Sequence, residues 1–194
     1  PITRWTDTMA PYLARAGYRG FLSNEIRIGE DKEPYMIDAT CRAPCPPNEL
    51  YQELYTNLSE IIWYGADGIL IEPIPAGKFG VEVILKSAWA ENNWQPIAFD
   101  PKFRNNIKLF NAVRIDGNYY IVPQDDDMVE IGAVVGWGDT LEEAIEMVKE
   151  AGDSIEGYGI KFNVGPVDMA KVQVAKIEQI GVSPFSIESE KEQS

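Results

Sequence analysis

The sequence contains no histidine and only two cysteines among its 194 residues. Histidine is the commonest general base and metal ligand near neutral pH, so its absence excludes Ser-His-Asp and Cys-His nucleophilic schemes. Cys41 and Cys45 alone cannot complete a four-ligand zinc site, and we expect them to be reduced, partly buried thiols. Any chemistry of this chain therefore depends on carboxylates, lysine, arginine or a bound metal.

Basic residues are also few. The chain has 17 basic and 31 acidic residues and a formal net charge of -14, which argues against a nucleic-acid partner because phosphate backbones require a basic surface. No apolar run approaches the roughly 18 residues of a membrane span, so we expect no membrane partner. No signal peptide opens the sequence, and we therefore expect a cytoplasmic location.

The residue pattern of the first part, residues 1–75, predicts an α+β fold. Proline and glycine signals separate its segments, and apolar residues recur at helical or strand spacing within them. The predicted elements are a helix over 6–16, capped by Thr6 or Asp7 and ended by Gly17, strands over 21–28 and 34–42 with a turn at 30–33, and one helix from 48 to about 65.

The composition of residues 74–80 is that of a linker, and we place a domain boundary between 75 and 76. The second domain, 76–185, is predicted to be a small mixed sheet with helices, and 186–194 to be a disordered acidic tail. A capping box is expected from Thr140 and Glu143. The predicted strands are 81–85, 108–115, 119–122 and 129–135, with a tight turn at 116–118 and a last helix over 167–181.

The hairpin of the first domain carries the residues of greatest chemical interest. If its strands pair across residues 30–33, Glu25 lies opposite Asp38, Ser23 opposite Thr40 and Phe21 opposite Arg42. All six side chains then share one face, because side chains alternate along a strand. Two carboxylates directly opposite each other are destabilising unless a cation lies between them.

Two interpretations of this face remain open. Carboxylate and hydroxyl oxygens suit Mg²⁺, which takes one or two protein carboxylates and completes its shell with water and nucleotide phosphates, and the Arg42 guanidinium matches phosphate geometry. Alternatively, Arg27 and Arg42 neutralise Glu25 and Asp38, and the face is a salt-bridged, solvated sheet surface.

A sequence resemblance favours the metal. The segments Gly17-Tyr-Arg-Gly-Phe21, Asn24-Glu-Ile-Arg-Ile28 and Pro34-Tyr-Met-Ile-Asp-Ala-Thr-Cys-Arg42 resemble the last metal-binding segment of ATP-grasp ligases. Within that superfamily they are most similar to the phosphoribosylamine-glycine ligase family, and the similarity extends over roughly residues 7–160. It implies the C-terminal part of an ATP-grasp lobe, an antiparallel sheet with helices, followed by that family's small C-terminal domain.

The resemblance also implies a role for each hairpin residue. Glu25 and Asp38 are similar to the acidic metal ligands, and Thr40 stands where the family has an asparagine ligand. Arg42 corresponds to the arginine that binds nucleotide phosphate and acts in catalysis. The implied cofactors are Mg²⁺ and ATP.

The implied function is that of a fragment of an ATP-dependent carboxylate-amine ligase, acting through an acyl phosphate in purine biosynthesis. Its expected partners are the N-terminal portion of the parent protein and small-molecule substrates, and we expect the chain alone not to turn over ATP. The family's Gly-Asp-Pro-Glu is replaced by Pro44–Pro47. Because of this departure, two alternatives stay open. One is a non-catalytic module that provides a binding surface, and the other is part of a grasp ligase for another acid and amine.

Overall fold

The computed structural model describes residues 2–29, 31, 33–124 and 129–179, which fall into two compact units divided between Asn163 and Val164. The second unit contains helix α5 (Gly165–Gln179), close to the predicted helix over 167–181. The predicted tail, 186–194, lies outside the described residues. No helix in the described part of the chain is long and apolar enough to cross a membrane.

Helix α1 (Ile2–Arg15) opens the first unit. It begins before Thr6 and Asp7, so the prediction that one of them caps it is wrong; no glycine or proline lies between Ile2 and Asp7 to stop the helix. Its predicted end is confirmed. Gly17 has a φ of 69°, and the amides of Gly17 and Tyr18 donate to carbonyls of the last turn, which is the usual glycine-terminated ending.

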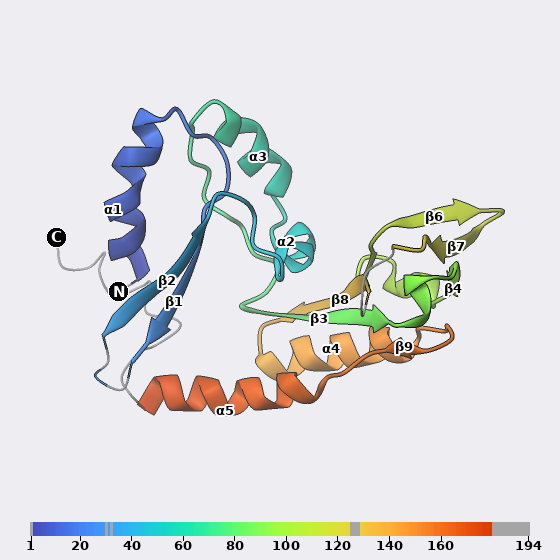
Figure 1. Ribbon diagram of the computed structural model, residues 1–194. Helices are drawn as coiled ribbons and strands as arrows, with labels where there is room; N and C mark the ends of the chain where they lie inside the picture. The colour runs from blue at the N-terminus through green and yellow to red at the C-terminus, as the bar shows by residue number, and fades with distance from the viewer. Residues whose placement is uncertain (1, 30, 32, 125–128, 180–194) are drawn as a thin grey trace. The chain divides into compact units, whose positions relative to one another are not determined.

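Strands β1 (Ser23–Ile28) and β2 (Pro34–Thr40) form the predicted antiparallel hairpin (Figure 1). Beyond it, the predicted single helix over 48–65 is wrong, because the chain forms α2 (Asn48–Leu54) and α3 (Leu58–Ala66). Tyr55 between them is extended, with a ψ of 104°.

The break between α2 and α3 is held by the segment that follows α3. The Thr56 amide donates to the Ile74 carbonyl at 2.9 Å. The Asn57 side chain accepts from the Ile74 amide and donates to the Glu72 carbonyl, both at 2.9 Å. Hydrogen bonds to a segment distant in sequence therefore replace those that would continue the helix. The predicted boundary between 75 and 76 stays a prediction.

A four-stranded sheet forms the centre of residues 79–161, with strand order β5-β8-β3-β9. Its strands are β3 (Phe79–Ser87), β5 (Ile107–Leu109), β8 (Glu130–Gly138) and β9 (Ile160–Lys161). Helix α4 (Leu141–Asp153) packs along β3 and β8 (Figure 1). The predicted capping box of Thr140 and Glu143 is confirmed. The core between helix and sheet contains Val83, Leu85, Val134, Ala144, Ile145 and Val148.

A three-stranded sheet comprises β4 (Gln95–Ile97), β7 (Asn118–Ile121) and β6 (Ala112–Ile115), and 3₁₀ turns cover 89–91 and 101–103. The predicted turn between β6 and β7 is confirmed, since Asp116 and Gly117 have φ values of 48° and 88°. The predicted strand over 108–115 is divided. Asn111, with a φ of 46°, separates β5 from β6, which belong to different sheets.

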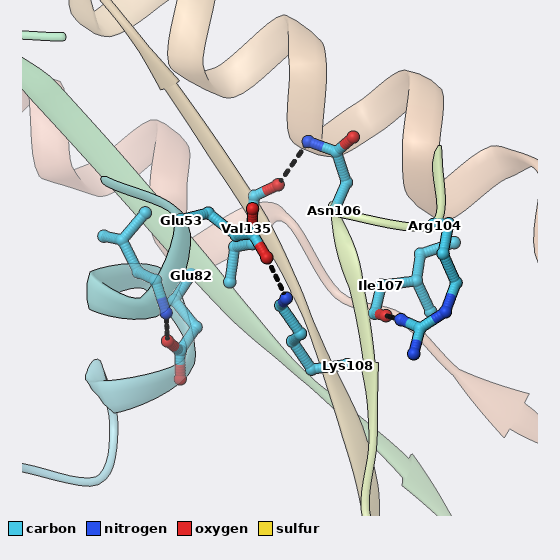
Figure 2. A network of polar contacts seen from close by, with 8 residues as sticks. Glu53, Glu82, Arg104, Asn106, Ile107, Lys108 and Val135 are labelled. Carbon is cyan, nitrogen blue, oxygen red and sulfur yellow. Dashed lines mark hydrogen bonds and ion pairs between the residues drawn. The ribbon is translucent and has the colours of Figure 1, made fainter. Parts of the chain in front are cut away.

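Helix α2 is anchored to the four-stranded sheet by apolar and ionic contacts. Leu50 and Leu54 are buried in a cluster with Val135 of β8. The Lys108 ammonium of β5 pairs with the Glu53 carboxylate, and both side chains are largely buried (Figure 2). A largely buried ion pair of this kind couples the helix to the strand more strongly than a surface pair would.

Two acidic side chains also meet at the start of α2. The Glu82 carboxylate of β3 accepts from the Leu50 amide at 2.9 Å, and Glu49 is buried beside it. One oxygen of each carboxylate is buried without a hydrogen-bond partner. Burial raises the pKa of Glu82 to about 7, opposed by the Leu50 amide and reinforced by the adjacent Glu49 carboxylate. The pair is therefore most stable when it holds a proton.

The glycine before β3 predicts a measurable packing effect. Gly77 is buried, and a Cβ there would lie 2.7 Å from the Gly138 carbonyl oxygen. We expect Gly77→Ala to lower the free energy of unfolding by about 1–3 kcal/mol in urea titrations, because backbone would have to move. Gly65→Ala is the control: a Cβ at Gly65, inside α3, would meet no atom within 4 Å. It should be neutral or stabilising, and equal losses in both variants would contradict this packing.

The Glu82 pKa predicts how stability depends on pH. The folded pKa of about 7 exceeds the ordinary value of 4.5, so between these values the folded chain holds a proton that the unfolded chain releases. The free energy of unfolding should therefore fall as the pH rises from 4.5 to about 7. Glu82→Gln, which keeps an acceptor for the Leu50 amide, should flatten this dependence in urea titrations at pH 5 and 8. The exposed control Glu146→Gln should retain it; the same slope in both variants would refute the assignment.

Candidate functional site

A cavity of about 1050 Å³ lies between the β1–β2 hairpin and the α2–α3 segment. Its lining includes all four residues to which the sequence analysis assigned roles: Glu25, Asp38, Thr40 and Arg42. The structure thus brings the predicted set together on one surface.

The register of the hairpin places the two acids directly opposite each other. Ser23 pairs with Thr40 and Glu25 with Asp38, as predicted. The next pair, Ile26 with Met36, skips one residue of β2, so the hairpin contains a β-bulge immediately beyond the two acids. Bulges change the direction of neighbouring side chains and often adjoin binding sites.

The Glu25 carboxylate is partly neutralised within its own strand. Arg27 donates from Nε and Nη2 to Glu25 Oε1, at 2.9 and 2.7 Å. The two side chains are 74% and 49% exposed, so the ion pair is accessible to water and contributes little to stability. Both contacts fall on Oε1, which leaves Oε2 outside this pair. The salt-bridged interpretation of the face therefore holds for Glu25 and Arg27.

The Asp38 carboxylate has a different neighbour. Thr40 Oγ1 donates to Asp38 Oδ2 at 2.9 Å. This bond holds the hydroxyl beside the carboxylate and leaves the hydroxyl's lone pairs free to accept or to bind a cation.

Arg42 lies beyond the end of β2, so the predicted strand pair of Phe21 with Arg42 is wrong. The chain turns after Thr40, and the Arg42 amide donates back to the Thr40 carbonyl at 2.9 Å. The guanidinium donates from Nη1 to the Ala43 carbonyl at 2.9 Å. Arg42 still lines the cavity and is exposed, so its remaining donors can face an anion.

The oxygen donors of this face fit Mg²⁺ better than zinc. Two carboxylates and one hydroxyl are hard ligands, and Mg²⁺ needs only one or two carboxylates because it keeps water and phosphate oxygens in its shell. Within the described residues no group of three or more His, Cys, Asp or Glu side chains converges, as an all-protein metal cage would require. Glu25, Asp38 and Thr40 would therefore hold a metal that shares its shell with a ligand.

The two cysteines are free, as expected, but exposed, so the expectation of partly buried thiols is wrong. They lie in the segment that follows β2. Cys45 lines the cavity. Desolvation, followed by the Glu49 and Glu82 carboxylates, raises the pKa of its thiol, which therefore stays protonated and weakly nucleophilic at neutral pH.

The opposite wall of the cavity is aromatic and apolar, and sequence reasoning did not assign it a role. Tyr51 and Tyr55 stack with their ring centroids 5.2 Å apart and an interplanar angle of 22°. Burial, then Tyr55 and Glu82, raise the pKa of Tyr51, so its hydroxyl remains a neutral donor and acceptor. The available signal was the spacing of the two tyrosines, four residues apart on one helical face.

Comparison with known proteins identifies the fold. No protein-family model matches the chain, and no curated protein matches its sequence. A crystal structure of phosphoribosylamine-glycine ligase from Thermotoga maritima matches it with a TM-score of 0.61 and 22% identity, over 77% of this chain and 38% of that one. The likeness confirms, for the fold, the resemblance that the hairpin motif predicted. The chain has the mixed α+β fold of a portion of phosphoribosylamine-glycine ligase and spans 38% of that protein's length.

Proposed function

We propose that this chain is part of an ATP-dependent carboxylate-amine ligase and supplies the metal-binding and phosphate-binding face of its active site. The observation that carries the proposal is the direct pairing of Glu25 with Asp38, beside Thr40 and Arg42, on the wall of one cavity. The similarity in fold to phosphoribosylamine-glycine ligase supports the reaction class.

Each residue has a role in this proposal. Glu25 and Asp38 would hold Mg²⁺, with Thr40 as a further oxygen ligand, and the metal would neutralise charge on the β- and γ-phosphates. Arg42 would orient the transferred phosphate with its free guanidinium donors. A carboxylate oxygen of the substrate attacks the γ-phosphorus as its bond to ADP breaks. An amine then attacks the acyl carbon, phosphate leaves, and the amine loses a proton to give the amide.

The rest of the active site would come from a second lobe, because an ATP-grasp ligase holds the nucleotide between two lobes. The partner in this proposal is the N-terminal portion of the parent protein, and the chain alone would not turn over ATP. The matched ligase's name gives glycine and phosphoribosylamine as its own substrates. For this chain we propose either that reaction, as a step of purine biosynthesis in the cytoplasm, or the same chemistry on another acid and amine.

One observation favours a second candidate function, a non-catalytic binding module. Arg27 already occupies Glu25 Oε1, and a permanent ion pair would leave Asp38 as the sole free carboxylate of the pair. The two functions differ in whether Mg²⁺ displaces Arg27.

Asp38→Asn tests the proposed site. Isothermal titration of Mg-tripolyphosphate, which offers the metal and phosphates without the nucleoside, should show binding to the 194-residue chain. The amide would weaken that binding at least about tenfold, because a neutral oxygen replaces a charged ligand. Asp153→Asn, an exposed change at the end of α4, is the matched control. Equal affinity in wild type and Asp38→Asn would remove the metal assignment, and no binding at all would favour the non-catalytic module.

Arg27→Gln tests the competition between arginine and metal for Glu25. Removing the guanidinium frees Glu25 Oε1, so Mg²⁺ should bind more tightly by about two- to fivefold, the range for an exposed ion pair. Mg²⁺ titration followed by NMR of the Glu25 side chain gives the affinity. Arg114→Gln, on β6 of the three-stranded sheet, should leave the affinity unchanged. Unchanged or weaker Mg²⁺ binding in Arg27→Gln would contradict competition between Arg27 and the metal for Glu25.

A further inference from the structure

The charged residues of the cavity are confined to its hairpin side. Among the described residues that line it, only Glu25, Asp38 and Arg42 are charged. In the proposed function the two acids hold the metal and Arg42 orients the transferred phosphate, so Arg42 is also the one charged group beside the substrate carboxylate that attacks this phosphate. The lining thus offers a partner for a carboxylate but no spare carboxylate for an ammonium group.

The side away from the hairpin is suited to an apolar group. It includes the stacked pair Tyr51 and Tyr55, with Pro44, Pro47, Leu58 and Ile61 around it, and its polar side chains, Asn48 and Gln52, are uncharged. The two rings are held in place from behind, because both pack against the buried cluster of Leu50, Leu54 and Val135. A rigid aromatic wall of this kind binds a further ring with little loss of side-chain entropy.

The size of the cavity agrees with a bulky ligand. Its volume of about 1050 Å³ lies slightly above the range of about 300–1,000 Å³ that is usual for small-molecule sites. A substrate as small as glycine would leave the aromatic wall uncovered and its own ammonium group without a charged partner.

We propose that the acid substrate of this site is a monocarboxylic acid bearing an aromatic ring, with its carboxylate near Arg42 and its ring on Tyr51 and Tyr55. The inference rests on the proposed function for one point, that the carboxylate of this acid is the group that attacks the γ-phosphorus. The ring subsite itself depends only on Tyr51, Tyr55 and the surrounding prolines and aliphatic residues. Specificity then comes from the aromatic wall, and the hairpin supplies the chemistry.

The test measures binding of 3-phenylpropionate to the full chain without metal or nucleotide, by isothermal titration or ligand-observed NMR. Tyr51→Leu and Tyr55→Leu should each weaken binding about tenfold, whereas Tyr51→Phe, which keeps the ring, should bind like wild type. Tyr64→Leu is the matched control, because Tyr64 is on α3, is 43% exposed and is not among the lining residues. Circular dichroism checks that each variant is folded.

Ligand selectivity tests the same inference on the unaltered chain. 3-Cyclohexylpropionate, of similar size but without a π-system, should bind several-fold more weakly than 3-phenylpropionate, and millimolar glycine should not compete. Absence of 3-phenylpropionate binding, equal binding of the cyclohexyl acid, competition by glycine, or unchanged affinity in both leucine variants would each overturn the inference.

The outcomes separate this inference from the proposed function. The Asp38→Asn variant should lose binding of Mg-tripolyphosphate and retain binding of 3-phenylpropionate. If wild type binds Mg-tripolyphosphate but not the aromatic acid, the ring subsite is wrong and the ligase proposal stands. If it binds only the aromatic acid, the ligase proposal fails and the acid is not its substrate.

Discussion

The carboxylates of Glu25 and Asp38 lie directly opposite each other on the β1–β2 hairpin, and their neighbouring side chains offset part of the repulsion between them. Arg27 neutralises one oxygen of Glu25, and the Thr40 hydroxyl donates to Asp38. Neither contact bridges the two carboxylates. A cation between them would relieve the repulsion, and phosphate oxygens in its shell would lie within the same cavity as Arg42. The repulsion between the two carboxylates destabilises the hairpin when no cation is bound, and for this reason we propose that the pair binds one.

The second requirement is that α2 keep the aromatic wall in place. Its apolar face is fixed to β8 through Leu50 and Leu54, and the Glu53–Lys108 ion pair fixes it to β5. Glu82 adds a hydrogen bond to its first turn, at the cost of a buried acidic pair with Glu49. The side of the cavity that would select the substrate is therefore built on the sheet, whereas the metal-binding side is on an exposed hairpin.

Local patterns determined what could be predicted from the sequence. The hairpin register follows from strand alternation, the α4 cap from Thr140 and Glu143, and the β6–β7 turn from Asp116-Gly117. Two of the errors have a common cause: contacts between residues far apart in sequence override local preference. Residues 72–76 divide the predicted helix at Tyr55, and a change of sheet divides the predicted strand at Asn111. A third error is local, because the turn after Thr40 separates Arg42 from Phe21. The tyrosine wall was missed because its role depends on the cavity and not on a motif.

The central claim is that Glu25 and Asp38 together bind a divalent cation. Mn²⁺ accepts the same oxygen ligands as Mg²⁺ and broadens NMR signals of nearby nuclei, so it reports the location of the site directly. Adding substoichiometric Mn²⁺ to the isotopically labelled chain should first broaden the amides of residues 23–26 and 36–40, and excess Mg²⁺ should restore them. Broadening centred on other acidic residues, such as those of α4, with the hairpin signals unchanged, would contradict the account.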